Sequence, residues 1–228
     1  MRPRITISKE NYLKAIAEAQ SEGEIVKAVT LSRWLDVSAP AVTMAIKRLR
    51  RDKLIRVGPE GQITLAAAGS RIANRLLNRH HLIERMLAEI FGLEWYKVHD
   101  EAEQLEHAVS ADFERKLIEK LGAGSACPHG NILGMDSPAA RRKRGLKPLD
   151  EAHAGEEVSV VSVFERDRAF LEYLDGEGIR PGAQCTIGAA AKSIDVRVAT
   201  RQVRLDQSVA SKIWVKVLAV SPKLKAES

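Results

Sequence analysis

Apolar residues change their spacing part-way along this 228-residue chain. Up to about residue 125 they recur at helical spacing, whereas beyond about Gly155 they alternate in five short runs: 158–163, 184–187, 194–198, 202–205 and 213–217. Helical spacing places apolar side chains on one face of a helix, whereas alternation places them on one face of a strand. The two parts are therefore expected to form different secondary structure. We therefore predict a mainly α N-terminal two-thirds followed by a small, closed C-terminal β-barrel.

The first 66 residues follow a recognisable order of elements. Helices are predicted at 8–20 and 28–35, and a third helix begins after Ser38, with Pro40 in its first turn. Two β-prone runs then flank a turn at 58–61. Helix, turn, helix and hairpin in this order are typical of a winged helix-turn-helix. A three-helix bundle with a solvated basic face is the alternative.

Positive charge is concentrated in this segment. The whole chain has 36 Lys and Arg against 30 Asp and Glu, a net charge of +6, and residues 1–60 alone have 12 against 7, a net charge of +5. A basic helix suits polyanionic DNA. The predicted base contacts are Ser38, Pro40, Ala41, Thr43 and Met44, and the predicted phosphate contacts are Lys47, Arg48 and Arg51.

A second pattern places histidines and carboxylates at helical spacing. One predicted helix, 98–121, carries four of them at i, i+4, i+7 and i+8: His99, Glu103, Glu106 and His107. The preceding helix, predicted at 66–93, repeats the pairing with His80 and Glu84. His81 falls off this stripe and is expected to be exposed. Mixed nitrogen and oxygen donors suit a divalent first-row metal, although single His–Glu pairs are also common on exposed helices.

The sequence carries no catalytic signature. It lacks a His-Glu-x-x-His motif, a Gly-x-Ser-x-Gly elbow, a phosphate loop and a dinucleotide fingerprint, so we expect neither an enzyme nor a small organic substrate. Its two cysteines, Cys127 and Cys185, suit a reducing cytoplasm. Cys127 and His129 are expected to form a structural turn. No stretch reaches the length of a membrane span, so a cytoplasmic protein without membrane contact is predicted.

Longer motifs resemble one known family. The chain is similar to the diphtheria toxin repressor and manganese-transport regulator family of metal-dependent transcriptional repressors over nearly its whole length. The motifs that carry the resemblance are Asn11-Tyr12-Leu13, Arg79-His80-His81-Leu82-Ile83-Glu84-Arg85, Lys97-Val98-His99-Asp100-Glu101-Ala102-Glu103, Glu106-His107 and Cys127-Pro128-His129-Gly130-Asn131. The implied regions are a winged helix-turn-helix at 1–66, a helical metal-binding and dimerisation domain at 67–125, a linker at 126–154 and an SH3-like, FeoA-related domain at 155–222.

The resemblance also implies two metal sites. The primary, activating site comprises Asn11, Glu103, Glu106 and His107, and the ancillary site comprises His80, Glu84 and His99. Oxygen ligands favour Mn²⁺, with Fe²⁺ as the alternative. Lys14 occupies the position of a further carboxylate in manganese-type members, so we expect its cation to discourage their two-metal arrangement. Arg166 and Ala169 occupy the usual ligand positions of the C-terminal domain, so no ligand is expected at either.

Together these observations predict a repressor for which metal is the corepressor. A homodimer is expected to bind a palindromic operator in double-stranded DNA and to control metal-ion homeostasis. Two alternatives stay open: a winged-helix regulator that senses a non-metal signal, and a helical metalloprotein that does not bind DNA.

Overall fold

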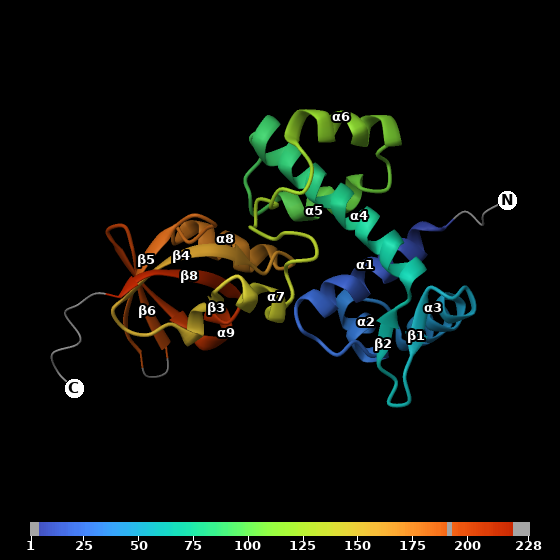
Figure 1. Ribbon diagram of the computed structural model, residues 1–228, viewed down its shortest axis with the longest axis horizontal. Coiled ribbons are helices and arrows are strands. Elements are labelled where there is room, and N and C mark those ends of the chain that lie inside the picture. Colours follow the sequence, from blue (N-terminus) through green and yellow to red (C-terminus); the bar gives the residue numbers. More distant parts are fainter. Residues whose placement is uncertain (1–4, 191–192, 221–228) are drawn as a thin grey trace.

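The computed structural model describes residues 5–190 and 193–220 (Figure 1). A helical N-terminal part precedes a C-terminal domain built on an antiparallel sheet, which confirms the predicted division between helical and β structure. In Figure 1 the winged-helix segment, in blue and cyan, lies beside the C-terminal domain, in orange and red, and the green helices lie above their junction. Within the described ranges, no helix combines the length and the apolarity needed to cross a bilayer.

The first part is a winged helix-turn-helix, as predicted. It comprises α1 (Ile7–Ser21), α2 (Ala28–Leu35), α3 (Ala39–Arg51), β1 (Ile55–Val57) and β2 (Ile63–Leu65). Asp36 ends α2 in the left-handed conformation, with a φ of 50°. Pro40 lies in the first turn of α3, where its missing N–H leaves no helical hydrogen bond unmade. The three helices and the hairpin share one apolar core, which includes Leu13, Ile16, Leu31, Leu49 and Ile63.

The helical domain follows the hairpin. It comprises α4 (Ala67–Arg85), the π-helical turn η1 (Met86–Ile90), α5 (Val98–Leu105) and α6 (Ala111–Leu121). The single helix predicted over 98–121 is therefore wrong, because a turn separates α5 from α6. Ser110 begins α6, since its hydroxyl accepts a hydrogen bond from the backbone N–H of Phe113 at 3.2 Å. The turn takes His107 off the helical stripe that holds His99, so the two histidines face different partners.

The C-terminal domain is an open six-stranded antiparallel sheet. Its strands, in spatial order, are β3 (Leu146–Pro148), β8 (Ile213–Val220), β4 (Glu156–Val163), β5 (Gln184–Ala190), β6 (Ser193–Val198) and β7 (Arg201–Asp206). The predicted closed barrel is wrong, because among the described strands β3 and β7 are the two edges and do not pair with each other. The edge strand β3 is only three residues long and ends in Pro148, which has no N–H to donate to a further strand.

Short helical segments complete this domain. They are α7 (Pro138–Lys143), η2 (Leu149–Glu151), α8 (Arg168–Gly176) and α9 (Gln207–Ala210). The range 126–154, expected as a linker, thus holds α7, η2 and the strand β3, which pairs with β8. The segment between β4 and α8 reaches back to the winged helix: Phe164 lies edge-on to Trp34 of α2, with 6.4 Å between ring centroids. The C-terminal domain therefore contacts the winged helix at α2.

Candidate metal centre and DNA-binding surface

Two histidines and a glutamate meet in the interior of the helical domain. We call His80, Glu84 and His99 the ancillary cluster. Nε2 of His80 lies 3.0 Å from Nδ1 of His99 and 3.1 Å from Oε1 of Glu84. Nδ1 of His99 lies 3.2 Å from the same carboxylate oxygen. The i, i+4 spacing on α4 thus brings His80 and Glu84 to His99 of α5, and all three side chains are buried.

The ancillary cluster offers suitable donors to a divalent cation. One candidate ligand atom from each residue lies within 4.8 Å of the others. Oε2 of Glu84 and Nε2 of His99 are buried and lack a hydrogen-bond partner among the described residues, although buried polar atoms are normally paired. Nitrogen and oxygen donors of this kind suit first-row divalent metals. The residues present therefore fit a bound metal ion.

Charge in the ancillary cluster is balanced by ion pairs among its members and their buried neighbours. Burial and the Lys14 ammonium lower the pKa of His80, but Glu84 and the hydrogen bond to Glu106 outweigh them and raise this pKa to about 9. Burial raises the pKa of Glu84, but the imidazoles of His80 and His129 outweigh burial and hold this pKa well below its usual range. His80 and Glu84 therefore form an ion pair, and His80 has to lose a proton before it can bind a metal.

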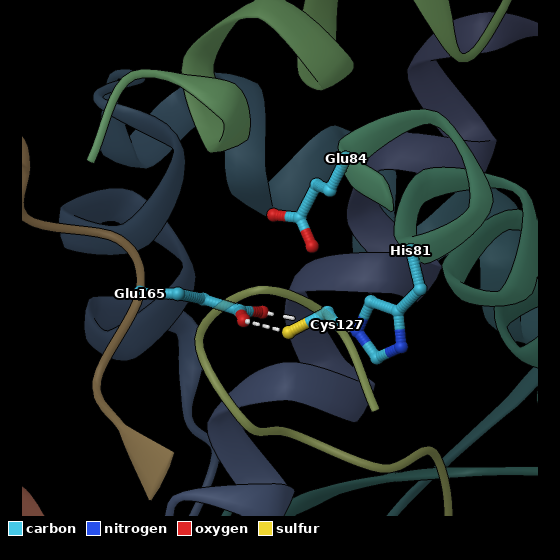
Figure 2. Close-up of side chains that lie close together, drawn as sticks. All are labelled: His81, Glu84, Cys127 and Glu165. Atoms are coloured by element: carbon cyan, nitrogen blue, oxygen red, sulfur yellow. Dashed lines mark hydrogen bonds and ion pairs between the residues drawn. The ribbon is translucent and has the colours of Figure 1, made fainter. Parts of the chain in front are cut away.

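A second group of candidate ligands overlaps the first (Figure 2). Ligand atoms of His81, Glu84, Cys127 and Glu165 also lie within 4.8 Å of one another. Figure 2 shows the two α4 residues on one side, with Cys127 and Glu165 approaching from other parts of the chain. Sγ of Cys127 is 3.3 Å from Oε2 of Glu165. Nδ1 of His129 is 3.5 Å from both Glu84 and Glu165, so this imidazole lies within the same group.

This second group differs from the sequence-based expectations. His81 is buried rather than exposed, and its Nε2 lies 4.0 Å from a carboxylate oxygen of Glu165. Cys127 and His129 do form a turn, in which the N–H of Gly130 donates to the Cys127 carbonyl at 2.8 Å, yet both side chains also face candidate ligands. Glu165 was missed, since no motif in the sequence marks it.

We call Asn11, Glu103, Glu106 and His107 the primary cluster. Oδ1 of Asn11 is 2.7 Å from Nε2 of His107, and Oε1 of Glu106 is 3.6 Å from the same nitrogen. Nδ1 of His107 is 3.1 Å from a carboxylate oxygen of Glu10, a neighbour that sequence reasoning missed although it adjoins Asn11 on α1. Asn11, Glu106 and His107 thus meet across the boundary between the winged helix and the helical domain.

Lys14 of α1 lies between the two clusters. Its ammonium donates to Oε2 of Glu106 at 2.8 Å, lies 3.0 Å from Nδ1 of His80 and is 3.6 Å from Glu103. Burial lowers the pKa of Lys14, but the surrounding carboxylates, Glu18 first among them, outweigh burial and raise this pKa. The Lys14 ammonium therefore lies among the carboxylates of the primary cluster and beside His80.

Glu103 is the most exposed member of the primary cluster, with a side chain that is 41% exposed. Its Oε1 is 3.6 Å from the Lys14 ammonium and 3.3 Å from the guanidinium of Arg166 in the C-terminal domain. Burial raises the pKa of Glu103, but Lys14 and the other nearby cations outweigh burial and lower it. Glu103, Asn11 and Glu106 line a cavity of about 230 Å³, which gives the Glu103 carboxylate room to move.

The basic helix α3 presents its polar face to solvent. All eight predicted DNA contacts are exposed: Ser38, Pro40, Ala41, Thr43, Met44, Lys47, Arg48 and Arg51. Val42 and Leu49 are buried on the opposite face and hold the helix to its core. The β1–β2 hairpin lies next to α3 and projects from the same part of the molecule (Figure 1). An exposed basic helix beside a hairpin is the arrangement expected of a DNA-binding winged helix.

Three family profiles match the chain in succession. They are described as the iron dependent repressor N-terminal DNA binding domain, over residues 4–63, the iron dependent repressor metal binding and dimerisation domain, over 66–132, and the FeoA domain, over 147–217. The diphtheria toxin repressor of Corynebacterium efficiens is 32% identical over 188 residues, which cover 78% of this chain and 81% of that protein. The chain belongs to the diphtheria toxin repressor family. It is thus a member of a family of metal-dependent transcriptional repressors, with its DNA-binding domain at the N-terminus.

Other relatives carry different metals in their names. The iron-dependent repressor IdeR of Mycobacterium tuberculosis is 31% identical over 189 residues, covering 78% of this chain and 82% of that protein. A manganese-dependent transcriptional repressor solved with manganese is 30% identical, with a TM-score of 0.81 over 92% of this chain and 100% of that one. ScaR solved with bound Zn²⁺ is 26% identical, with a TM-score of 0.76 over 92% and 99%. Membership of the diphtheria toxin repressor family therefore shows divalent-metal dependence but not which metal.

Proposed function

We propose that this repressor binds its operator when Mn²⁺ occupies the primary cluster, with Fe²⁺ as the alternative metal and Asn11, Glu103, Glu106 and His107 as the ligands. The observation that carries the proposal is the 2.7 Å contact between Asn11 of α1 and His107 of the helical domain. This contact joins the DNA-reading part to the metal-binding part through two candidate ligands. Three of the four proposed ligands are oxygen donors, which favours Mn²⁺ over softer metals.

Asn11, Glu103, Glu106 and His107 would hold the ion, which would supply the positive charge that their oxygen and nitrogen atoms face. In its absence, Glu103 and Glu106 depend on basic side chains for counter-charge, and Asn11 holds α1 by its contact with His107. With the ion bound, Asn11, and therefore α1, would be held more firmly against the turn after α5, where it already contacts His107. Because α1 shares its apolar core with α2 and α3, fixing α1 also fixes the DNA-reading helix.

His80, Glu84 and His99 serve in this proposal as the ancillary site. They join α4 to α5, and the overlapping group adds Cys127 and Glu165 from the chain that follows. Glu84 belongs to both groups, so one ion can draw on either set. The Cys127 thiol favours softer ions such as Zn²⁺, whereas the two imidazoles and one carboxylate of the His80 set suit first-row divalent ions such as Fe²⁺. We assign to this site a structural role, because its members lie outside the DNA-binding domain.

On DNA, α3 of each protomer of a homodimer enters the major groove of one half of a palindromic operator. The hydroxyls of Ser38 and Thr43 face base edges, and the apolar side chains Pro40, Ala41 and Met44 contact thymine methyl groups. Phosphate contacts come from Lys47, Arg48 and Arg51. The genes controlled in this way serve metal-ion homeostasis, and the protein has no catalytic role.

Fluorescence anisotropy of labelled promoter DNA tests the proposal. The metal-free protein is compared with protein that carries Mn²⁺, anaerobic Fe²⁺ or Zn²⁺, and we expect Mn²⁺ or Fe²⁺ to tighten binding in a strongly salt-dependent way. DNA binding that no metal stimulates contradicts the proposal. Unchanged metal dependence in Glu106→Ala favours a regulator of a non-metal signal, and metal binding without DNA binding favours a metalloprotein of another kind.

A further inference from the structure

One short segment of the C-terminal domain touches both groups of metal ligands and the helix-turn-helix. It consists of Phe164, Glu165 and Arg166, between β4 and α8. Glu165 faces the ancillary side, where Oε2 lies 3.3 Å from Sγ of Cys127. Arg166 faces the primary side, and Phe164 packs edge-on against Trp34. Successive side chains of this segment therefore reach two different clusters.

Arg166 contacts three separate elements. Its guanidinium donates to Oε2 of Glu18 on α1 at 2.6 Å, to Oε1 of Glu103 on α5 at 3.3 Å and to the Trp34 carbonyl of α2 at 3.1 Å. It also lies over the Trp34 ring, 4.9 Å from the centroid. The side chain is 19% exposed, so water screens these contacts only in part. A planar guanidinium with five N–H groups can serve all of these partners at once, whereas a lysine ammonium cannot.

We propose that Arg166 is a positioning residue that couples the primary cluster to the helix-turn-helix, because it competes with metal for Glu103 and holds α2 against the C-terminal domain. This inference rests on the proposed role of Glu103 as a metal ligand. When Glu103 turns towards a bound cation, Arg166 loses one of its two carboxylates and keeps Glu18 and the Trp34 carbonyl. The C-terminal domain thus senses the primary cluster through a basic side chain and supplies no ligand to it.

The test uses the full-length protein with Arg166→Gln, Arg166→Lys and Arg168→Gln. Arg168 is the matched control: it lies two residues further along, is 49% exposed and pairs with Asp100 of α5 at 3.8 Å. Two quantities are measured. The first is the Mn²⁺ dissociation constant of the primary cluster by isothermal titration calorimetry. The second is hydrogen exchange of the α2 amides, residues 28–35, in the metal-free protein.

Arg166→Gln removes the guanidinium that competes with metal for Glu103 and that holds α2 through the Trp34 carbonyl. We expect Mn²⁺ to bind about 3- to 10-fold more tightly, because Glu103 no longer has to leave a guanidinium, and α2 amides to exchange about 10-fold faster. Arg166→Lys keeps a charge beside Glu103 but cannot serve Glu18 and the Trp34 carbonyl together. Its Mn²⁺ affinity should therefore stay near that of the wild type while α2 exchange rises. Arg168→Gln should change neither quantity.

Wild-type Mn²⁺ affinity together with wild-type α2 exchange in Arg166→Gln overturns the inference, and so does an Arg168→Gln protein that behaves like Arg166→Gln. If circular dichroism shows Arg166→Gln to be unfolded, Arg166→Lys decides: faster α2 exchange at unchanged Mn²⁺ affinity supports the inference, and unchanged exchange overturns it. A wild-type protein that binds no Mn²⁺ contradicts the proposed function instead. In that case the hydrogen-exchange measurement, made without metal, still tests whether Arg166 holds α2 against the C-terminal domain.

Discussion

The two clusters lie on either side of Lys14 but are built differently. The ancillary cluster is closed: the side chains of His80 and Glu84 are 0% exposed, and ion pairs with each other and with Glu106 and His129 balance their charge. The primary cluster is open: it borders a cavity of about 230 Å³, and basic side chains from two other elements hold Glu103. The primary cluster spans α1 and α5, whereas the ancillary cluster joins α4 to α5. This difference supports our proposal that the primary cluster senses the metal.

Removal of the central carboxylate should have the largest effect on the closed cluster. Glu84→Ala leaves buried imidazoles without their counter-charge, so we expect the free energy of unfolding of the metal-free protein to fall by about 3–5 kcal/mol in urea denaturation. Glu89→Ala is the control, because Glu89 is 49% exposed and pairs with Arg85 nearby. Its loss should stay below about 1 kcal/mol. Equal losses of unfolding free energy in Glu84→Ala and Glu89→Ala would show that the buried cluster does not stabilise the fold more than an exposed ion pair does.

The charged histidines of the closed region should make metal-free stability depend on pH. The pKa of His80 is raised to about 9 and, because Glu84 and Glu165 outweigh burial, that of His129 to about 10, from an ordinary 6.5. Stability from a raised pKa is fully present below pH 6.5 and is lost as pH rises through 9 to 10. Between pH 7 and 10 we expect a fall of at least about 2–3 kcal/mol, which is the contribution of His80 alone, measured by urea denaturation. His153→Gln, at an exposed site, should keep this fall, and a flat profile in the wild type would show that these histidines are neutral.

Lys14→Met tests how the Lys14 ammonium affects metal binding at the open, primary cluster. Loss of the ammonium removes the cation that competes for Glu106 and Glu103, so Mn²⁺ affinity at the primary cluster should rise about 10-fold, or about 1.4 kcal/mol, in isothermal titration calorimetry. Lys9→Met is the control on the same helix, because Lys9 pairs with Asp52 instead. Weaker Mn²⁺ binding in Lys14→Met would show that the ammonium supports the site rather than competes for it.

The smallest expected effect concerns the DNA-binding surface of α3, which includes no residue of either cluster. Arg48→Gln removes one phosphate contact from α3, so we expect about threefold weaker operator binding and a salt-dependence slope smaller by about one. Anisotropy titrations at several salt concentrations measure both. Arg204→Gln, on the 72% exposed Arg204 of the C-terminal sheet, should leave both unchanged. An equal loss in the two variants would mean that the overall positive charge of the protein, not α3, attracts DNA.

Local signals made most of the helical part predictable. Pro40 at the start of α3 and the turn at 58–61 determine the winged helix through neighbouring residues alone. The break between α5 and α6 was missed, because apolar periodicity continues across it and the Ser110 cap is a weaker signal than that periodicity. Closure of the C-terminal sheet was also mispredicted, since closure depends on pairing between strands far apart in sequence.

In the metal site, too, contacts within one helix could be predicted, whereas contacts between distant segments could not. His80 and Glu84 share a helix, so their spacing alone predicted that they would meet. Glu165 could not be found by spacing, because more than eighty residues separate it from Glu84 and the fold alone brings them together. The resemblance aligned Arg166, rather than Glu165, with the usual ligand position. Glu165 and Arg166 are neighbours that face different clusters, so a shift of one residue in the alignment exchanges a candidate ligand for a cation.

Operator binding by two histidine variants tests the central claim most directly. In anisotropy titrations with and without Mn²⁺, His107→Ala should lose nearly all of a metal stimulation that we expect to be about 100-fold, because it breaks the link to Asn11. His99→Ala, in the closed cluster, should keep stimulation within about threefold of the wild type once circular dichroism shows that it is folded. Wild-type stimulation in His107→Ala, or an equal loss in both variants, would contradict the assignment of sensing to the primary cluster.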